Sequence, residues 1–304
     1  MVRPSRFTPR RASLASLGLA AAALAPLAQA DDHALILWIG QYADAQIRIV
    51  GVEQDARLAR GMARAMGVPE RNITELKNEQ LTHAGIKAAL AGLQARNRAG
   101  DNVMLYFSGH GQQRDRVLGG GGCSEGLATF EGGVYYDLLL RDQLDALADA
   151  ARRVVMFNDT CHSGGPVTKS FNPNPDPELQ PKAYPVANPA GQGSAGNISK
   201  GSGEAVDPGY PCGMASNAIS KAMGDTGNRR RDRVVYLAAA AADEAAFPSA
   251  QGSIATRAWS ACLQSGSQTG AELQRCAQNW VQSKAKFKQT ITLVGNGSML
   301  IGKL

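Results

Sequence analysis

Apart from one stretch near its start, the sequence lacks an apolar run that approaches the roughly 20 residues needed to cross a bilayer. That stretch, Leu14 to Leu27, is itself shorter than this limit, follows four arginines and no acidic residue, and is followed by AQA before Asp31. This order is typical of a cleaved secretory signal peptide and argues against a membrane anchor. The paired Arg10 and Arg11 resemble a twin-arginine export signal. We therefore expect residues 1–30 to be removed on export to the periplasm or beyond the cell.

The excess of positive over negative charge is also small once this leader is set aside. The chain has 32 Lys and Arg against 26 Asp and Glu, a net charge of +6, and four of the positive residues are the leader's arginines. The remaining chain therefore has 28 against 26, or +2. A protein that binds nucleic acid through its charge needs a larger basic excess, so we expect no nucleic-acid partner.

The sequence has no internal repeat, and its one low-complexity segment lies at residues 166–232. This segment is rich in Gly, Pro, Ser and Asn, a composition that cannot bury enough apolar surface to order itself. We interpret it as a flexible linker between two portions of one domain, residues 31–165 and 233–304.

On both sides of the linker, short apolar runs alternate with helical patterns. The runs predict buried strands at residues 34–40, 72–78, 102–108, 153–159, 233–240 and 289–295. The helical spacing predicts helices at residues 53–66, 82–98 and 141–151, and two more that begin at Thr256 and Gly270. This alternation predicts an α/β fold, with a mostly parallel sheet and helices on both faces.

Two of the predicted strands run directly into reactive side chains. His110 follows the strand at 102–108, and Cys161 follows the strand at 153–159. The carboxyl ends of parallel strands meet at one edge of a sheet, where a thiol and an imidazole can act as nucleophile and base. Taken singly, the cysteine could be a buried small residue and the histidine the end of a strand. Together they favour a reactive pair, and we expect His162 only to support the turn because its side chain points away.

The motifs YFSGHG and DTCHSG resemble the two catalytic motifs of caspase-like cysteine peptidases, specifically of the metacaspase and bacterial caspase-homologue branch. The resemblance extends over nearly all of the chain after the leader, through HALILWIGQYAD, GVEQDA, AAADEAAFP and TLVGNGSML. The cysteine signature of animal caspases is absent. The resemblance implies a caspase-like three-layer sandwich, with residues 31–165 as the large-subunit-like portion and residues 233–304 as the small-subunit-like portion.

The resemblance also implies roles for individual residues, with peptides or proteins as substrates and no cofactor. His110 matches the catalytic histidine and Cys161 the nucleophile, and the backbone N–H groups of Gly111 and Cys161 match the oxyanion hole. A noncatalytic caspase-like module that binds peptides or partners is one alternative, which a broken dyad would favour, but here the dyad is intact. A Cys-His peptidase of the same fold that resembles legumain or gingipain is the nearer alternative.

Three further residues match the pocket for the side chain that precedes the cleaved bond, the P1 residue. Asp55, Ser108 and Asp159 occupy the positions that hold a basic P1 side chain in metacaspases, while Val52 replaces a frequent cysteine. Two carboxylates and a hydroxyl suit a guanidinium or an ammonium. Singly, Asp55 could be a charge at a helix N-terminus and Asp159 a turn residue. Their joint match predicts cleavage after Arg or Lys.

The calcium-binding positions of metacaspases depart from the family pattern here. They correspond to Glu125, Arg141, Asp142 and Thr168, and only Asp142 is unchanged. Because calcium needs clustered oxygen ligands and Arg141 would repel a cation, we expect no calcium dependence and no bound metal.

The cysteines other than Cys161 are Cys123, Cys212, Cys262 and Cys276. We favour a bridge between Cys262 and Cys276, near facing ends of two predicted helices; two buried free thiols are the alternative.

The region between Gly164 and Arg233 carries basic residues that such a pocket would accept: Lys169, Lys182, Lys200, Lys221 and the cluster from Arg229 to Arg231. One end of this region lies near the reactive pair, so we hypothesise that the protein cleaves itself there. A plain exposed linker, with the arginine cluster as a solvated loop, is the alternative.

Overall fold

The structure is a computed structural model that describes residues 31–115, 123–161, 182, 231–241, 244–284 and 288–302. The predicted signal peptide and, apart from Lys182 and two residues at its C-terminal end, the predicted linker lie outside these residues. Cys212 and Thr168 lie outside them as well.

The described chain consists of strands, α-helices and short 3₁₀ turns. The strands are β1 (His33–Trp38), β2 (Ile73–Lys77), β3 (Asn102–Ser108), β4 (Gly111–Asp115), β5 (Cys123–Ala128), β6 (Val134–Tyr136), β7 (Arg153–Asp159), β8 (Val234–Ala238) and β9 (Thr292–Gly295). The α-helices are α1 (Val52–Ala65), α2 (His83–Arg96), α3 (Asp137–Ala150), α5 (Ile254–Gln264) and α6 (Gly270–Lys284). Short 3₁₀ turns occupy Ala45–Ile47, Glu70–Asn72, Asn78–Gln80 and Arg231–Arg233.

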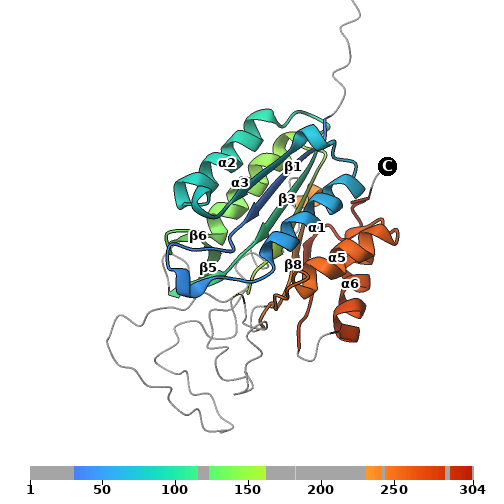
Figure 1. The fold of residues 1–304 in the computed structure, drawn as a ribbon. Helices are drawn as coiled ribbons and strands as arrows, with labels where there is room; N and C mark the ends of the chain where they lie inside the picture. Colours follow the sequence, from blue (N-terminus) through green and yellow to red (C-terminus); the bar gives the residue numbers. More distant parts are fainter. Residues whose placement is uncertain are drawn as a thin grey trace, which may run out of the picture.

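Six of the strands form the central sheet, in the order β2-β1-β3-β7-β8-β9. All neighbouring pairs are parallel except β8 and β9, which are antiparallel. Helices α2 and α3 cover one face of the sheet, and α1, α5 and α6 cover the other (Figure 1). The predicted three-layer α/β fold is therefore confirmed.

The two middle strands of this sheet, β3 and β7, consist entirely of buried residues. Parallel strands with helices on both faces need apolar side chains on both sides, which is why NVMLYFS and RVVMFND read as continuous runs rather than as alternating patterns. Strand β2 at the edge is only partly buried, in keeping with its weaker pattern.

A second sheet of three antiparallel strands, in the order β4-β5-β6, was not predicted. Its strands are short, and β4 and β5 each contain a glycine and several polar residues, so the sheet shows no clear apolar periodicity. Gly126 in β5 allows a close approach, because a Cβ there would lie 2.3 Å from the Tyr135 carbonyl oxygen of β6. Strand β4 begins at Gly111, directly after His110, so this small sheet borders the end of β3.

The C-terminal portion completes the central sheet rather than forming a sheet of its own. Strand β8 pairs with β7 from Val154↔Val234 to Asn158↔Ala238. Helices α5 and α6 are joined by the predicted disulfide between Cys262 and Cys276, whose Cα atoms lie 5.9 Å apart. The side chain of Cys123 lies outside the described part of the structure, and Cys161 is a free, buried thiol.

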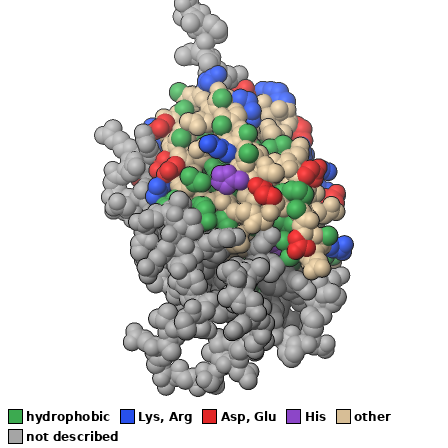
Figure 2. Space-filling model, turned by 90° about the vertical axis from the view of Figure 1, so that its left-hand side faces the viewer, with side chains coloured by type: hydrophobic (Ala, Val, Ile, Leu, Met, Phe, Trp, Pro, Cys, Tyr) green, Lys and Arg blue, Asp and Glu red, His purple; other side chains and the backbone are tan. Residues whose placement is uncertain are grey.

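The surface on one side of the molecule mixes charges of both signs. Lys and Arg side chains alternate there with Asp and Glu side chains over the described residues, and neither sign forms a large continuous area among them (Figure 2).

Candidate active site

The register between β3 and β7 sets the relative position of the thiol and the imidazole. The strands end level with each other, with Ser108 opposite Asp159. Two residues beyond these partners stand His110 and Cys161. The parallel pairing therefore brings the imidazole-bearing loop and the thiol-bearing loop to the same edge of the sheet.

Glycine at position 111 allows these two loops to touch. A Cβ on Gly111 would lie 1.7 Å from the carbonyl oxygen of Cys161, which no side chain could tolerate. The backbone N–H of Gly111 donates to the carbonyl oxygen of Lys182 at 2.9 Å.

The His110 ring is held by backbone and aromatic contacts. Its Nε2 lies 2.7 Å from the carbonyl oxygen of Ile47, and its backbone N–H donates to the Tyr42 hydroxyl at 2.7 Å. A carbonyl only accepts, so Nε2 carries the proton and Nδ1 of the neutral ring keeps a lone pair. Burial lowers the pKa of His110 to about 4, which favours this neutral form.

The Cys161 thiol is buried against the C-terminal portion of the chain. Its Sγ lies 3.2 Å from the Ala246 nitrogen, which donates to it, and 3.7 Å from the Ala246 carbonyl oxygen. Burial raises the pKa of the thiol to about 12, with the Ala246 contact acting in the opposite direction. In this structure the site therefore holds a neutral thiol and a neutral imidazole.

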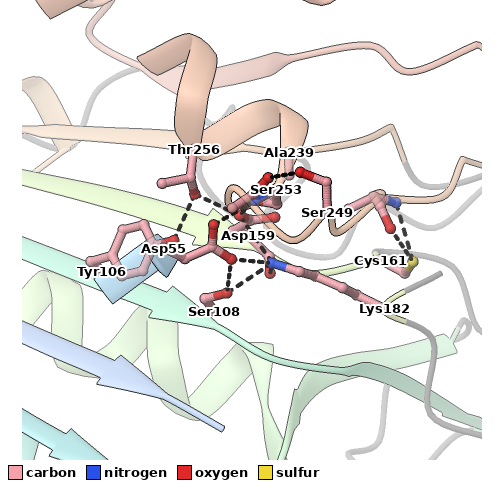
Figure 3. A network of polar contacts seen from close by, with 12 residues as sticks. Asp55, Tyr106, Ser108, Asp159, Cys161, Lys182, Ala239, Ser249, Ser253 and Thr256 are labelled. Atoms are coloured by element: carbon pink, nitrogen blue, oxygen red, sulfur yellow. Dashed lines mark hydrogen bonds and ion pairs between the residues drawn. The ribbon is translucent and has the colours of Figure 1, made fainter. Parts of the chain in front are cut away.

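A pocket of buried polar side chains lies beside the dyad, and its members come from separate elements. Asp55 is in the first turn of α1, Ser108 ends β3, and Asp159 ends β7. The Ser108 hydroxyl donates to Asp55 Oδ2 at 2.9 Å, and all three side chains are buried. The structure thus brings together the three residues that the sequence suggested for this pocket (Figure 3).

Two residues at the start of α5 complete the pocket and were not foreseen. Ser253 donates its backbone N–H to Asp55 Oδ1 at 2.6 Å and its hydroxyl to Asp159 Oδ2. Thr256 donates to Asp159 Oδ2 at 2.5 Å. Ser253 is the N-cap residue of α5, a position where a serine hydroxyl usually accepts a hydrogen bond from the helix backbone. Here the hydroxyl donates to the Asp159 carboxylate instead. No local sequence pattern indicates these contacts, because each joins residues more than 90 positions apart.

The pocket is filled by Lys182. Its Nζ lies 2.9 Å from Asp55 Oδ2, 3.1 Å from Asp159 Oδ2 and 2.8 Å from Ser108 Oγ, and its side chain is fully buried (Figure 3). Burial lowers the pKa of this ammonium, but the two carboxylates outweigh it and the net shift is upward. The ammonium therefore stays charged inside the protein.

The charge on the pocket carboxylates depends on that ammonium. Burial raises the pKa of Asp55, Lys182 acts against this effect, and neighbouring Asp159 adds to it. A pocket that holds two buried carboxylates is consequently stable in its charged form only around a cation.

Among the described residues, no group of three or more His, Cys, Asp and Glu side chains is arranged to hold a metal ion. Of the four positions suggested for calcium, Arg141 and Asp142 form an ion pair with each other at 2.7 Å on α3. The side chain of Glu125 lies outside the described structure. No helix in the described ranges is both long and apolar enough to cross a membrane.

An α/β sandwich with a thiol and an imidazole at the ends of adjacent parallel strands is the architecture of a cysteine-peptidase type of domain. The chain belongs to the caspase-domain family, since the profile of the caspase domain matches residues 31–297. The family supports a cysteine-peptidase type of function that acts on protein substrates. No curated protein matches the sequence significantly.

Solved structures share the fold at low sequence identity. A crystal structure of a Geobacter sulfurreducens protein is 18% identical with a TM-score of 0.59, over 88% of this chain and 94% of that one. Caspase-1 from Spodoptera frugiperda is 11% identical with a TM-score of 0.56, over 90% of each chain. At these identities the comparison concerns the fold alone.

Proposed function

We propose that the protein is an exported, calcium-independent cysteine endopeptidase that cleaves after Lys or Arg through His110 and Cys161. The observation that carries this proposal is the pocket beside the thiol, in which two buried carboxylates and a hydroxyl enclose an ammonium. An acidic or neutral P1 side chain would leave both carboxylates without a positive partner, whereas an ammonium or a guanidinium neutralises them.

The proposed reaction follows from the positions of the dyad and the Gly111 amide. The thiol proton passes to Nδ1 of His110 as Sγ of Cys161 attacks the P1 carbonyl carbon. The N–H groups of Gly111 and Cys161 stabilise the oxyanion, a type of contact worth about 3 kcal/mol per donor. The C–N bond breaks, the leaving amine takes the proton from the imidazole, and water then hydrolyses the thioester.

This mechanism predicts that Cys161→Ala and His110→Ala each lower kcat/KM for a basic peptide by on the order of 10⁴-fold or more, because the dyad acts as a unit. Fluorogenic peptide assays measure the loss, and thermal unfolding checks that both variants fold. Turnover near the wild-type rate in either variant would contradict the mechanism.

The pocket predicts a strong preference for Lys or Arg at P1. In Asp55→Asn and Asp159→Asn variants, kcat/KM for these peptides should fall by about 30-fold or more, because each substitution removes one partner of a buried charge pair. A panel of peptides that differ only at P1 provides the measurement.

Asp142→Asn is the matched control, since it removes one carboxylate from an exposed position on α3 and should leave the P1 preference unchanged. A preference for Asp at P1 would overturn the pocket assignment. A preference for Asn would favour an activity of the legumain type.

Calcium independence is supported by the ion pair between Arg141 and Asp142, which places a cation at one of the suggested ligand positions. We expect kcat/KM to be the same in EGTA and in excess CaCl₂. A loss of activity in EGTA that CaCl₂ restores would show that the protein binds calcium through other residues.

Export is supported by two features beyond the leader sequence. A disulfide such as Cys262–Cys276 persists in an oxidising compartment. The Asp31 nitrogen also lies 2.8 Å from Oδ1 of buried Asp101, so cleavage before Asp31 would place a new α-ammonium beside a carboxylate. We expect N-terminal sequencing of the protein from a periplasmic fraction to start at Asp31. An active protein that retains residues 1–30 in that fraction would contradict this.

A further inference from the structure

His110 lies between two glycines, Gly109 and Gly111, so its own stretch of chain does little to fix its conformation. Contacts with other parts of the protein hold its main chain instead. The His110 N–H donates to the hydroxyl of Tyr42 at 2.7 Å, and its carbonyl oxygen accepts from the Ala128 N–H at 3.0 Å. These two contacts determine where the backbone presents the imidazole.

The contact with Tyr42 is made by a side chain, whereas backbone groups make those with Ala128 and, at the ring Nε2, with Ile47. It joins parts of the chain that are 68 residues apart. The rings of Tyr42 and His110 also lie against each other, with centroids 5.0 Å apart and an angle of 35° between their planes. Tyr42 therefore contacts both the main chain and the ring of the proposed base.

The phenol reaches the His110 N–H because residue 109 is a glycine. A Cβ on Gly109 would lie 2.9 Å from the hydroxyl oxygen of Tyr42, which is too close for an unstrained contact. Tyr42 and His110 are both buried, so this N–H has no access to bulk water and needs a partner from the protein. The tyrosine hydroxyl is that partner.

The main chain on both sides of Tyr42 is itself fixed. Two N–H groups just before it, those of Gly40 and Gln41, donate to Asn78 Oδ1 at 3.0 and 3.2 Å. The N–H of the residue just after it donates to the carbonyl oxygen of Phe130 at 3.0 Å. The phenol therefore has little freedom to move, and it can hold the histidine in place.

The proposed reaction depends on the orientation of the imidazole. Its Nδ1 must take the proton of the Cys161 thiol, and a misplacement of about 1 Å in an active site can lower the rate about 100-fold. From these contacts we infer that Tyr42 is a positioning residue, whose hydroxyl fixes the main chain of His110 so that Nδ1 can accept the thiol proton. This inference rests on the proposed function and adds to it a residue that acts through His110.

Tyr42→Phe keeps the ring and removes only the hydroxyl. We expect this variant to lower kcat and kcat/KM for a basic fluorogenic peptide equally, on the order of 10-fold or more, because the loss of an effect on the transition state has that pattern and the loss of substrate binding does not. A wild-type kcat in Tyr42→Phe would overturn the inference, and so would a rise in KM at unchanged kcat.

Tyr236→Phe is the matched control. It removes the same oxygen from another buried tyrosine, whose hydroxyl accepts from Asn158 Nδ2 at 2.5 Å. Asn158 belongs neither to the dyad nor to the proposed P1 pocket, so kcat should stay at the wild-type value, while thermal unfolding should show a similar loss of stability in both variants. Equal losses of kcat in the two variants would assign the effect to stability and would overturn the inference.

A second measurement tests the orientation of the ring without the need for hydrolysis. The chain has four histidines, so the NMR signals of His110 in ¹⁵N-histidine-labelled protein can be assigned by their absence from His110→Ala. Wild type and Tyr236→Phe should show a ring protonated at Nε2 alone, whereas Tyr42→Phe should show a mixture of the two neutral forms. Identical His110 signals in wild type and Tyr42→Phe would overturn the inference. If wild type hydrolyses no basic peptide, the proposed function fails, and this comparison still tests whether Tyr42 orients the ring.

Discussion

Two carboxylates buried at one point of the fold, those of Asp55 and Asp159, set the main electrostatic constraint on this protein. Neither has water to stabilise its charge, so hydroxyl and amide donors and one ammonium must replace it. Ser108, Ser253 and Thr256 supply donors but no charge. The Lys182 ammonium is the positive charge that completes the set, since its Nζ contacts both carboxylates.

Because β3 and β7 end opposite each other, this pocket lies beside the reacting groups. Ser108 and His110 lie two residues apart on one strand end, and Asp159 and Cys161 lie two residues apart on the other. Lys182 contacts groups at both strand ends, since its Nζ lies against Ser108 and Asp159 and its carbonyl oxygen accepts from the Gly111 N–H.

The site also depends on the C-terminal portion, although the dyad itself belongs to the N-terminal one. Ala246 contacts the thiol, and the start of α5 contacts both carboxylates. These contacts hold because β8 extends the same sheet beside β7.

Local sequence determined much of the fold, since continuous apolar runs mark β1, β3 and β7 as fully buried strands, and helical spacing marks the buried faces of α1 and α2. It also placed His110 and Cys161 at strand ends, and family resemblance pointed to Asp55, Ser108 and Asp159. It did not reveal the sheet of β4, β5 and β6, because these strands are short and have neither a long apolar run nor a clear alternation of apolar and polar residues. Only the tertiary structure showed that Lys182 contacts Asp55 and Asp159 and that Ser253 and Thr256 donate to these carboxylates. Their contacts join residues that are far apart in the sequence, so no local sequence pattern indicates them.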